Sequence, residues 1–157
     1  MVIGWKEYLD LPELGLTRLK AKIDTGARTS SLHVSSSKVV AVHPDGSRDL
    51  EFTVARHRLH PEVATLVRAR ALREVLVTDS GGHRGLRPLI ETELILGPVR
   101  KRIALTLSDR SEMLFPMILG RTALTGDFLV DTSRKYLLRR WHRRPPSRNA
   151  EPSRSGG

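Results

Sequence analysis

The sequence has 157 residues, no cysteine and a formal net charge of +10, which is enough chain for one domain with a hydrophobic core but short for two. The lack of cysteine excludes disulfide frameworks, thiolate zinc sites and cysteine nucleophiles, and leaves histidine and carboxylates as the remaining zinc ligands. No apolar run approaches the roughly 20 residues that cross a bilayer, and the N-terminus lacks the pattern of a signal peptide, so we expect a cytoplasmic protein that does not bind membranes.

Short strands dominate the predicted elements. Between Arg18 and Asp24 the apolar residues fall on every second position, which predicts a strand with one buried face and Asp24 at its end on the polar side. One short helix is expected over 121–125. The further strand candidates are rich in Val, Ile and Leu, and are separated by turn signals: 37–42, 50–54, 74–78, 89–96, 103–107 and 135–138. This spacing predicts an all-β fold, a closed antiparallel β-barrel.

The C-terminal end differs in composition from the rest of the chain. From Arg134 onward eight Lys or Arg residues stand against one acid, which leaves 19 − 16 = +3 for the residues before it. Pro, Ser and Gly are frequent after residue 143, and such a segment cannot bury enough apolar surface to fold. We therefore expect a folded domain over 1–140 and a disordered basic tail over 141–157. A weak contact of this tail with RNA or the ribosome is conceivable, although a solvated basic end is commoner.

The triplet Asp24-Thr25-Gly26 follows the predicted strand 18–24. Alone it is a weak indication, because Asp and Gly are common turn residues. Its context makes it stronger, since a Ser/Thr-rich segment leaves the triplet and a second motif follows far downstream. That second motif reads F-P-M-I-L-G-R-T-A-L from Phe115. It places bulky apolar residues before Gly-Arg and the predicted short helix.

This pair of segments resembles the retropepsins, the retroviral-type aspartic proteases, in which a glycine-rich flap hairpin lies between the two motifs. Residues 78–86, T-D-S-G-G-H-R-G-L, occupy that position here. The resemblance implies Asp24, Thr25 and Gly26 as the catalytic triplet, and Leu119, Gly120 and Arg121 as its structural support. It also implies substrate contacts beside the loop and in the flap, from Ala27, Arg28, Gly81, Gly82, His83, Arg84 and Gly85.

A closer resemblance covers about residues 4–136. The series G-W-K-E-Y, L-P-E-L-G-L, A-K-I-D-T-G-A-R-T-S-S-L-H-V, R-P-L-I-E-T and L-F-P-M-I-L-G-R-T-A-L is similar to a bacterial family often described as ATP-dependent zinc proteases. Members of that family occur beside, or fused to, ligases that add glutamates to ribosomal protein S6.

Zinc and ATP are not supported by the residues themselves. No His-Glu-x-x-His motif and no Gly-Lys-Ser/Thr phosphate loop is present, and the pair His57 and His60 has no suitable carboxylate before Glu62. We therefore expect no metal and no cofactor.

Peptide hydrolysis by carboxylates needs two of them close together, one ionised and one protonated. A chain with one Asp-Thr-Gly supplies half of such a pair, so the expected enzyme is a homodimer with Asp24 of both subunits at the two-fold axis. By the resemblance Thr25 would hold the two loops together, Gly26 would let the backbone approach substrate, and the flap would close over the peptide.

Some points stay open from the sequence. In retropepsins the arginine that matches Arg121 pairs with an acid just after D-T-G-A. Here that position is Arg28, so Asp109, Asp131 or Glu112 are alternative partners. The segment 35–70 is longer than in the viral enzymes and has no assigned role.

The expected substrate is a peptide or protein, and Arg28, Arg84 and Arg87 favour an acidic, glutamate-rich one. Two other functions remain alternatives: an inactive binding module that uses its basic tail on RNA or the ribosome, and a zinc-dependent hydrolase.

Overall fold

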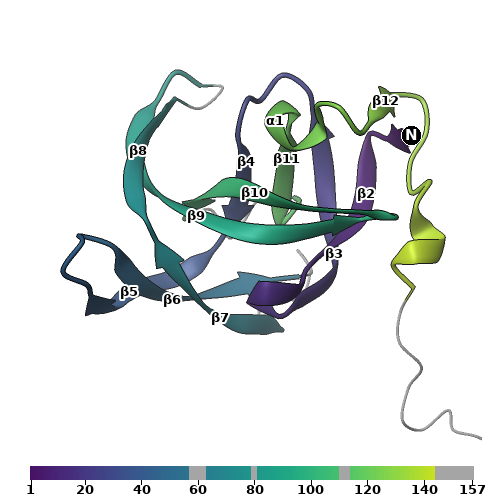
Figure 1. The fold of residues 1–157 in the computed structure, drawn as a ribbon. Coiled ribbons are helices and arrows are strands. Elements are labelled where there is room, and N and C mark those ends of the chain that lie inside the picture. Colours follow the sequence, from purple (N-terminus) through teal and green to yellow (C-terminus); the bar gives the residue numbers. More distant parts are fainter. Residues whose placement is uncertain (57–62, 79–80, 110–113, 144–157) are drawn as a thin grey trace, which may run out of the picture.

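The computed structural model describes residues 1–56, 63–78, 81–109 and 114–143. Within these ranges the chain forms strands with one short α-helix and two 3-10 turns (Figure 1). The elements are β1 (Val2–Gly4), β2 (Lys6–Leu11), η1 (Pro12–Leu14), β3 (Leu16–Asp24), β4 (Ser30–His33), β5 (Ser35–Val42), β6 (Arg48–Ala55), β7 (Ala64–Ala71), β8 (Arg73–Thr78), β9 (Arg84–Leu96), β10 (Val99–Ser108), β11 (Met117–Gly120), α1 (Arg121–Leu124), β12 (Leu129–Asp131) and η2 (Arg139–Trp141). The expected all-β class and the helix after Gly120 are confirmed.

A seven-stranded sheet forms the body of the molecule. Its order is β10-β4-β11-β3-β2-β9-β8, and β9 also pairs with β10. The sheet is mixed, because β4 runs parallel to β10 and β11 runs parallel to β3, so the expectation of a purely antiparallel arrangement was wrong. Closure of the sheet into a barrel stays a prediction. A separate pair, β1 with β12, is also parallel.

Alternation of apolar residues explains the strands that were predicted correctly. In β6, Leu50, Phe52 and Val54 point into the core while their neighbours are half-buried, and a period of two is what a strand with one buried face requires. The strands β1, β4, β11 and β12 were missed because each has only three or four residues. The strand β2 was missed because the acid Glu7 stands on its buried face, and β7 because its inward positions are mostly small residues rather than bulky apolar ones.

The long segment before the flap folds as a sheet of its own. Strands β5, β6 and β7 pair in that order, and β7 contacts β9 of the main sheet. Directly after β7, the backbone N–H of Leu72 donates to the carbonyl of Leu89 at 2.9 Å. The added segment therefore packs against the base of the β8–β9 hairpin, seen in the lower part of Figure 1.

Glu7 holds the two ends of the described chain together. Its carboxylate is fully buried and accepts hydrogen bonds from the backbone N–H groups of Gly4 at 2.7 Å, Leu137 at 2.9 Å and Leu138 at 3.1 Å. These bonds explain why the strand predicted over 135–138 is absent, because two of the N–H groups that a strand ladder would use turn inward to Glu7. Residues 137–138 form a turn instead, and residues 135–136 have no regular secondary structure.

The C-terminal segment remains packed past residue 140. His142 is buried, and its Nε2 accepts the backbone N–H of Gly97 at 2.9 Å. The packed part of the chain thus extends two residues beyond the expected domain boundary. Residues 144–157 lie outside the described ranges, so the disordered tail stays a prediction. None of the helices in the described residues is long and apolar enough to cross a membrane.

Replacing Glu7 with Gln should destabilise the fold by about 2 to 3 kcal/mol, because an amide NH₂ would face one of the backbone donors and leave it buried without an acceptor. The free energy of unfolding, measured in urea, checks this. Glu74→Gln is the matched control, since the Glu74 carboxylate is exposed and makes one surface ion pair with Arg48 at 3.4 Å. Equal stability of the two variants would contradict the role of Glu7.

Candidate active site

Asp24 is the last residue of β3, half-buried, where the chain leaves the sheet. Its Oδ1 accepts the backbone N–H of Gly26 at 3.0 Å, and its backbone carbonyl accepts the N–H of Ala27 at 3.2 Å. The loop is therefore a tight turn folded back on the carboxylate, a common geometry for Asp at a turn. Thr25 and Gly26 are exposed at its tip.

Strand β11 packs directly against this loop from inside the molecule. Gly120 is the register partner of Asp24 in the parallel β3–β11 pair, and Leu119 before it is fully buried. The backbone N–H of Gly120 donates to Oγ of buried Ser30 at 3.0 Å. A Cβ at position 120 would lie 2.7 Å from the carbonyl carbon of Thr29 and 2.9 Å from the carbonyl oxygen of Ala27. Only glycine allows this approach without moving the loop.

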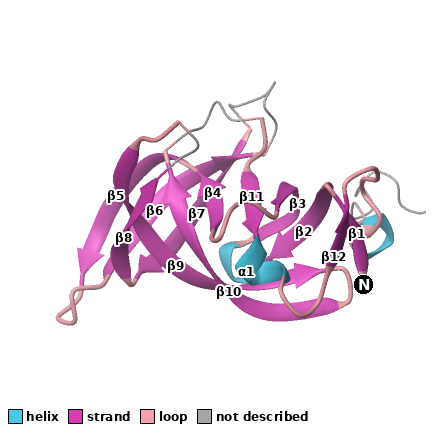
Figure 2. Cartoon of the chain, turned by 90° about the horizontal axis from the view of Figure 1, so that it is seen from above, coloured by secondary structure: helices cyan, strands magenta, loops and turns pink. Residues whose placement is uncertain are grey.

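Helix α1 continues the same contact. The backbone N–H of Arg121 donates to the Ala27 carbonyl at 2.8 Å, and Thr122 donates to the Arg28 carbonyl with its hydroxyl at 2.8 Å. The Arg121 guanidinium forms long hydrogen bonds to the carbonyls of Thr25 and Gly26, at 3.5 and 3.3 Å. Seen from above, α1 lies beside β10 and β11 (Figure 2). These contacts place Gly120 and Arg121 against the loop, and the support role of Leu119, Gly120 and Arg121 stays a prediction.

The partner of Arg121 differs from the alternatives considered from the sequence. In the described residues Arg121 forms no ion pair with Asp109 or Asp131, and the Asp131 carboxylate instead accepts from the hydroxyl of Ser133 at 2.6 Å. Glu112 lies outside the described residues. The guanidinium reaches the backbone of the β3–β4 loop directly, so an acid after D-T-G-A is not needed to hold it there.

The predicted flap is a hairpin of β8 and β9. Thr78 is paired with Arg84 and Val77 with Gly85. Gly82 has a φ of +83°, the left-handed region that glycine adopts without strain. Gly81, Gly82, His83 and Arg84 are exposed, and Asp79 and Ser80 lie outside the described residues. The hairpin tip and the β3–β4 loop lie at the same end of the molecule (Figure 1).

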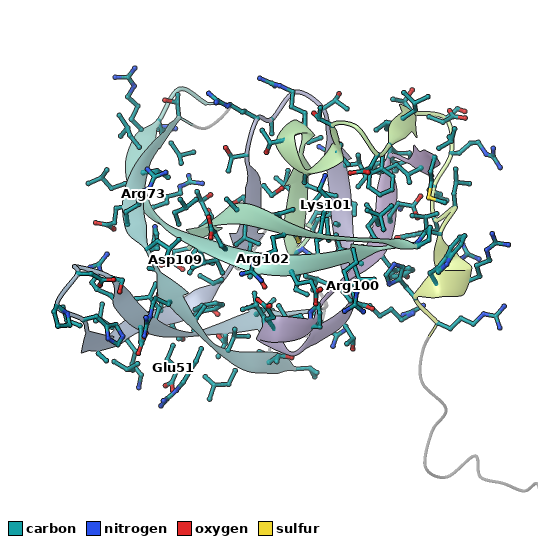
Figure 3. All side chains as sticks on the ribbon, viewed as in Figure 1. Glu51, Arg73, Arg100, Lys101, Arg102 and Asp109 are labelled. Atoms are coloured by element: carbon teal, nitrogen blue, oxygen red, sulfur yellow. The ribbon has the colours of Figure 1, made fainter. Side chains whose placement is uncertain are left out.

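A pocket of about 630 Å³ lies between the loop, the hairpin and the sheet. The loop contributes Arg28 and Thr29, while β8, β9, β10 and α1 form the remaining walls. Arg73 and Arg102, labelled in Figure 3, also line it. The Arg102 guanidinium pairs with Glu13 at 2.8 Å. The lining residues are Arg28, Thr29, Arg73, Val75, Leu76, Val77, Leu89, Arg102, Ile103, Ala104, Thr106, Thr122 and Ala123.

The three arginines singled out from the sequence do not converge on one pocket. Arg28 lines the large pocket, whereas Arg87 lines a second pocket of about 320 Å³ together with Asp109. Arg84 is at the hairpin tip and lines neither of these two pockets. Arg73 was not anticipated, because its place in the wall of the large pocket follows from strand pairing that one sequence does not reveal. Ser30 and Thr122 were missed for the same reason.

Metal binding has no candidate in the described ranges, where no group of three or more His, Asp or Glu side chains could hold an ion. His57 and His60, the pair considered from the sequence, lie outside these ranges.

Comparison with known proteins agrees with this geometry. The family model described as RimB-like, retropepsin-like aspartic endopeptidase RimB, matches residues 2–140. A probable alpha-L-glutamate ligase of Parasynechococcus marenigrum is 35% identical over 140 residues, and one of Desulfotalea psychrophila is 34% identical over 139. The matches cover 88% and 87% of this chain but 29% of each relative. The chain therefore spans less than a third of the length of these relatives.

A solved structure has the same fold. The crystal structure of a Legionella pneumophila protein of unknown function matches with a TM-score of 0.68 and 25% sequence identity, and covers 88% of this chain and 98% of that one. The predicted resemblance to the retropepsin-like family is confirmed by the family match.

Substituting Gly120 with Ala should lower the free energy of unfolding by about 2 kcal/mol, because the new methyl group would overlap the backbone of Thr29. Gly85→Ala is the matched control, since a Cβ there meets no atom within 4 Å. Thermal and urea unfolding of both variants check the prediction. A Gly120→Ala protein as stable as Gly85→Ala would show that the loop can move aside without cost.

Proposed function

The chain belongs to the RimB-like family of retropepsin-like aspartic endopeptidases, and on that premise we propose that it is an aspartic endopeptidase whose catalytic residue is Asp24. The observation that carries the proposal is the construction of the loop. A carboxylate stands at a strand end with an exposed Thr25-Gly26 tip, and Gly120 and Arg121 hold the loop backbone from behind. A turn with no function would not need a second strand and a helix to fix its position.

The chemistry requires a second carboxylate. One ionised aspartate takes a proton from water, while a protonated partner polarises the scissile carbonyl. Two like charges held together favour this split state, because the second ionisation is opposed by the first. The proposed active form is a homodimer in which the Asp24 carboxylates of two copies meet. The exposed Thr25 and Gly26 would then face their counterparts in the other subunit.

The hairpin and the large pocket suit a peptide substrate. An extended peptide lying between the β3–β4 loop and the β8–β9 hairpin would pass Ala27 and Arg28 on one side and Gly82 to Gly85 on the other. Closure of the hairpin over it would exclude water from the reacting bond. The pocket beside Arg28 is apolar at Val75, Val77 and Ile103, so it would hold the stem of a side chain.

We further propose that the substrate is acidic. Arg28, Arg73 and Arg102 stand around the pocket, and cations around a cleft attract a peptide of opposite charge. The relatives named probable alpha-L-glutamate ligase contain a stretch similar to nearly the whole of this chain. A peptidase acting on glutamate-rich chains would be the chemical counterpart of a ligase that uses glutamate.

Changing Asp24 to Asn should lower peptidase activity by about a thousandfold, because the amide can neither take a proton from water nor share one with its partner. Cleavage of a peptide mixture rich in glutamate, followed by mass spectrometry at acid and neutral pH, measures the loss. Asp45→Asn is the control for the same chemical change, on the turn between β5 and β6. Activity that persists in Asp24→Asn would end the proposal, and activity sensitive to a chelator would favour a zinc-dependent hydrolase instead.

Mixing subunits tests the shared site. If wild-type protein is unfolded and refolded with about a tenfold excess of Asp24→Asn, most wild-type subunits should pair with an inactive copy. Activity per wild-type subunit should then fall to about a tenth. An inert protein in the same excess provides the control. Unchanged activity would mean that one chain carries the complete site, which would contradict the homodimer.

A further inference from the structure

Four of the six lysines of this protein gather on one face of the β2–β3 pair. In β3 the odd positions 19, 21 and 23 are buried, so Lys20, Lys22 and Asp24 share the outward face. In β2 the outward face carries Lys6, Tyr8 and Asp10. The register places Lys6 opposite Lys22 and Tyr8 opposite Lys20. The row of lysines therefore ends at Asp24.

Lys135 joins the row from the C-terminal segment. The backbone N–H of Tyr136 donates to the carbonyl of Lys6 at 2.9 Å, which brings residue 135 beside β2. Burial lowers the pKa of the Lys6 ammonium group, and the nearby charges of Lys135 and Lys20 lower it further. These effects mean that the ammonium groups are close enough to repel one another. We call Lys6, Lys20, Lys22 and Lys135 the lysine row.

Within the described part of the chain, no lysine of the lysine row forms an ion pair with a carboxylate. The ion-paired lysines there are the other two, Lys38 with Glu51 at 3.3 Å and Lys101 with Asp127 at 2.7 Å. Of the two acids of β2, Glu7 points inward to three backbone donors. Asp10 lies on the outward face, accepts the backbone N–H of Arg18 at 2.7 Å and lies 3.3 Å from Nδ1 of His142. Packing four cations together without pairing them to acids costs stability, so the arrangement fits a negatively charged ligand that is bound from outside.

The spacing of the row matches an extended polypeptide. Residues two apart on a strand lie about 6.6 Å apart, and paired residues on neighbouring strands lie about 5 Å apart. Lys22 thus lies about 6.6 Å along the strand from Asp24, and Lys20 lies about twice that distance from it. An extended substrate with carboxylates on alternate residues has the same repeat, so each of its acidic side chains would meet one ammonium group.

We propose that the lysine row on the outward face of β2 and β3 is a binding site for an acidic, extended polypeptide segment that flanks the bond cleaved at Asp24. This inference rests on the proposed peptidase function and adds the residues that recognise the substrate outside the pocket. Lysine suits such a site, because its ammonium group is a compact charge without the fixed bidentate geometry of arginine. A lysine can therefore pair with any carboxylate of an acidic segment, whichever of the segment's residues lies next to it.

An acidic polypeptide fits this face better than single-stranded RNA. RNA binding uses aromatic faces on which bases stack, but here Tyr8 and Tyr136 stack on each other at 4.7 Å. The guanidinium of Arg18 lies 4.2 Å from the centroid of the Tyr8 ring and the Lys6 ammonium group 5.3 Å from that of Tyr136. The rings are already occupied by cations and by each other, which leaves charge as the feature offered to a ligand.

Binding to the full chain carrying Asp24→Asn tests the proposal without cleavage of the probe. The probe is a fluorescent peptide of about twelve alternating glutamate and serine residues, and its partner has glutamine in place of glutamate. The double change Lys20→Gln and Lys22→Gln should weaken binding of the glutamate peptide about tenfold at low salt, and leave the glutamine peptide unaffected. Lys38→Gln is the matched control on the β5–β6–β7 sheet and should change binding less than twofold.

Three outcomes are decisive. Equal effects of the Lys20/Lys22 and Lys38 changes would overturn the proposal. Tighter, lysine-dependent binding of a single-stranded RNA of the same charge would overturn it in favour of a nucleic-acid surface. Charge-dependent peptide binding in a wild-type protein that cleaves nothing would support the lysine row as a binding site and refute the proposed peptidase.

Discussion

The close contact between Gly120 and the backbone of residues 27–29 is the constraint on which the arrangement of the site depends. Because position 120 has no Cβ, β11 approaches the β3–β4 loop closely enough for Arg121 and Thr122 to donate to its carbonyls. Without these donors, the carbonyls of Ala27 and Arg28 would have no hydrogen-bond partner at the start of α1. The contact therefore positions Asp24, orients Arg121 toward the loop tip, and begins α1 in the same few residues.

This constraint also explains why a mixed sheet is needed. For Gly120 to stand beside Asp24, β11 must run parallel to β3, so that both strands end at the same edge. The same edge receives β4, which leaves the loop and pairs with β11 on its other side. A purely antiparallel sheet would have placed the end of one strand next to the start of the other. The glycine and the aspartate would then lie at opposite edges, and the loop would lose its support.

Elements that show their pattern along the chain could be predicted from the sequence, whereas those that depend on tertiary contacts could not. Periodicity along the chain located β3, β5, β6, β8, β9 and β10, because each has enough residues to show alternation. A short strand such as β11 forms only because neighbouring strands pair with it. The sequence marked this segment through its resemblance to a family motif, not through alternation of apolar residues. The strand predicted over 135–138 was wrong because a buried carboxylate 130 residues away in sequence competes for the N–H group of Leu137. The contact of Arg121 with carbonyls, and the place of Arg73 in the same pocket as Arg28, likewise depend on tertiary structure.

Strand β9 connects the site to the rest of the fold. It runs for 13 residues, from the hairpin tip at Arg84 to Leu96, next to Gly97, whose N–H donates to buried His142. Along this length it pairs with β8, β10 and β2, and β7 packs against it. The added β5–β6–β7 sheet therefore supports the base of the hairpin, and at Gly82 a Cβ would meet no atom within 4 Å. A base fixed by neighbouring strands suits the predicted flap, because movement of the hairpin tip would then leave the walls of the pocket in place.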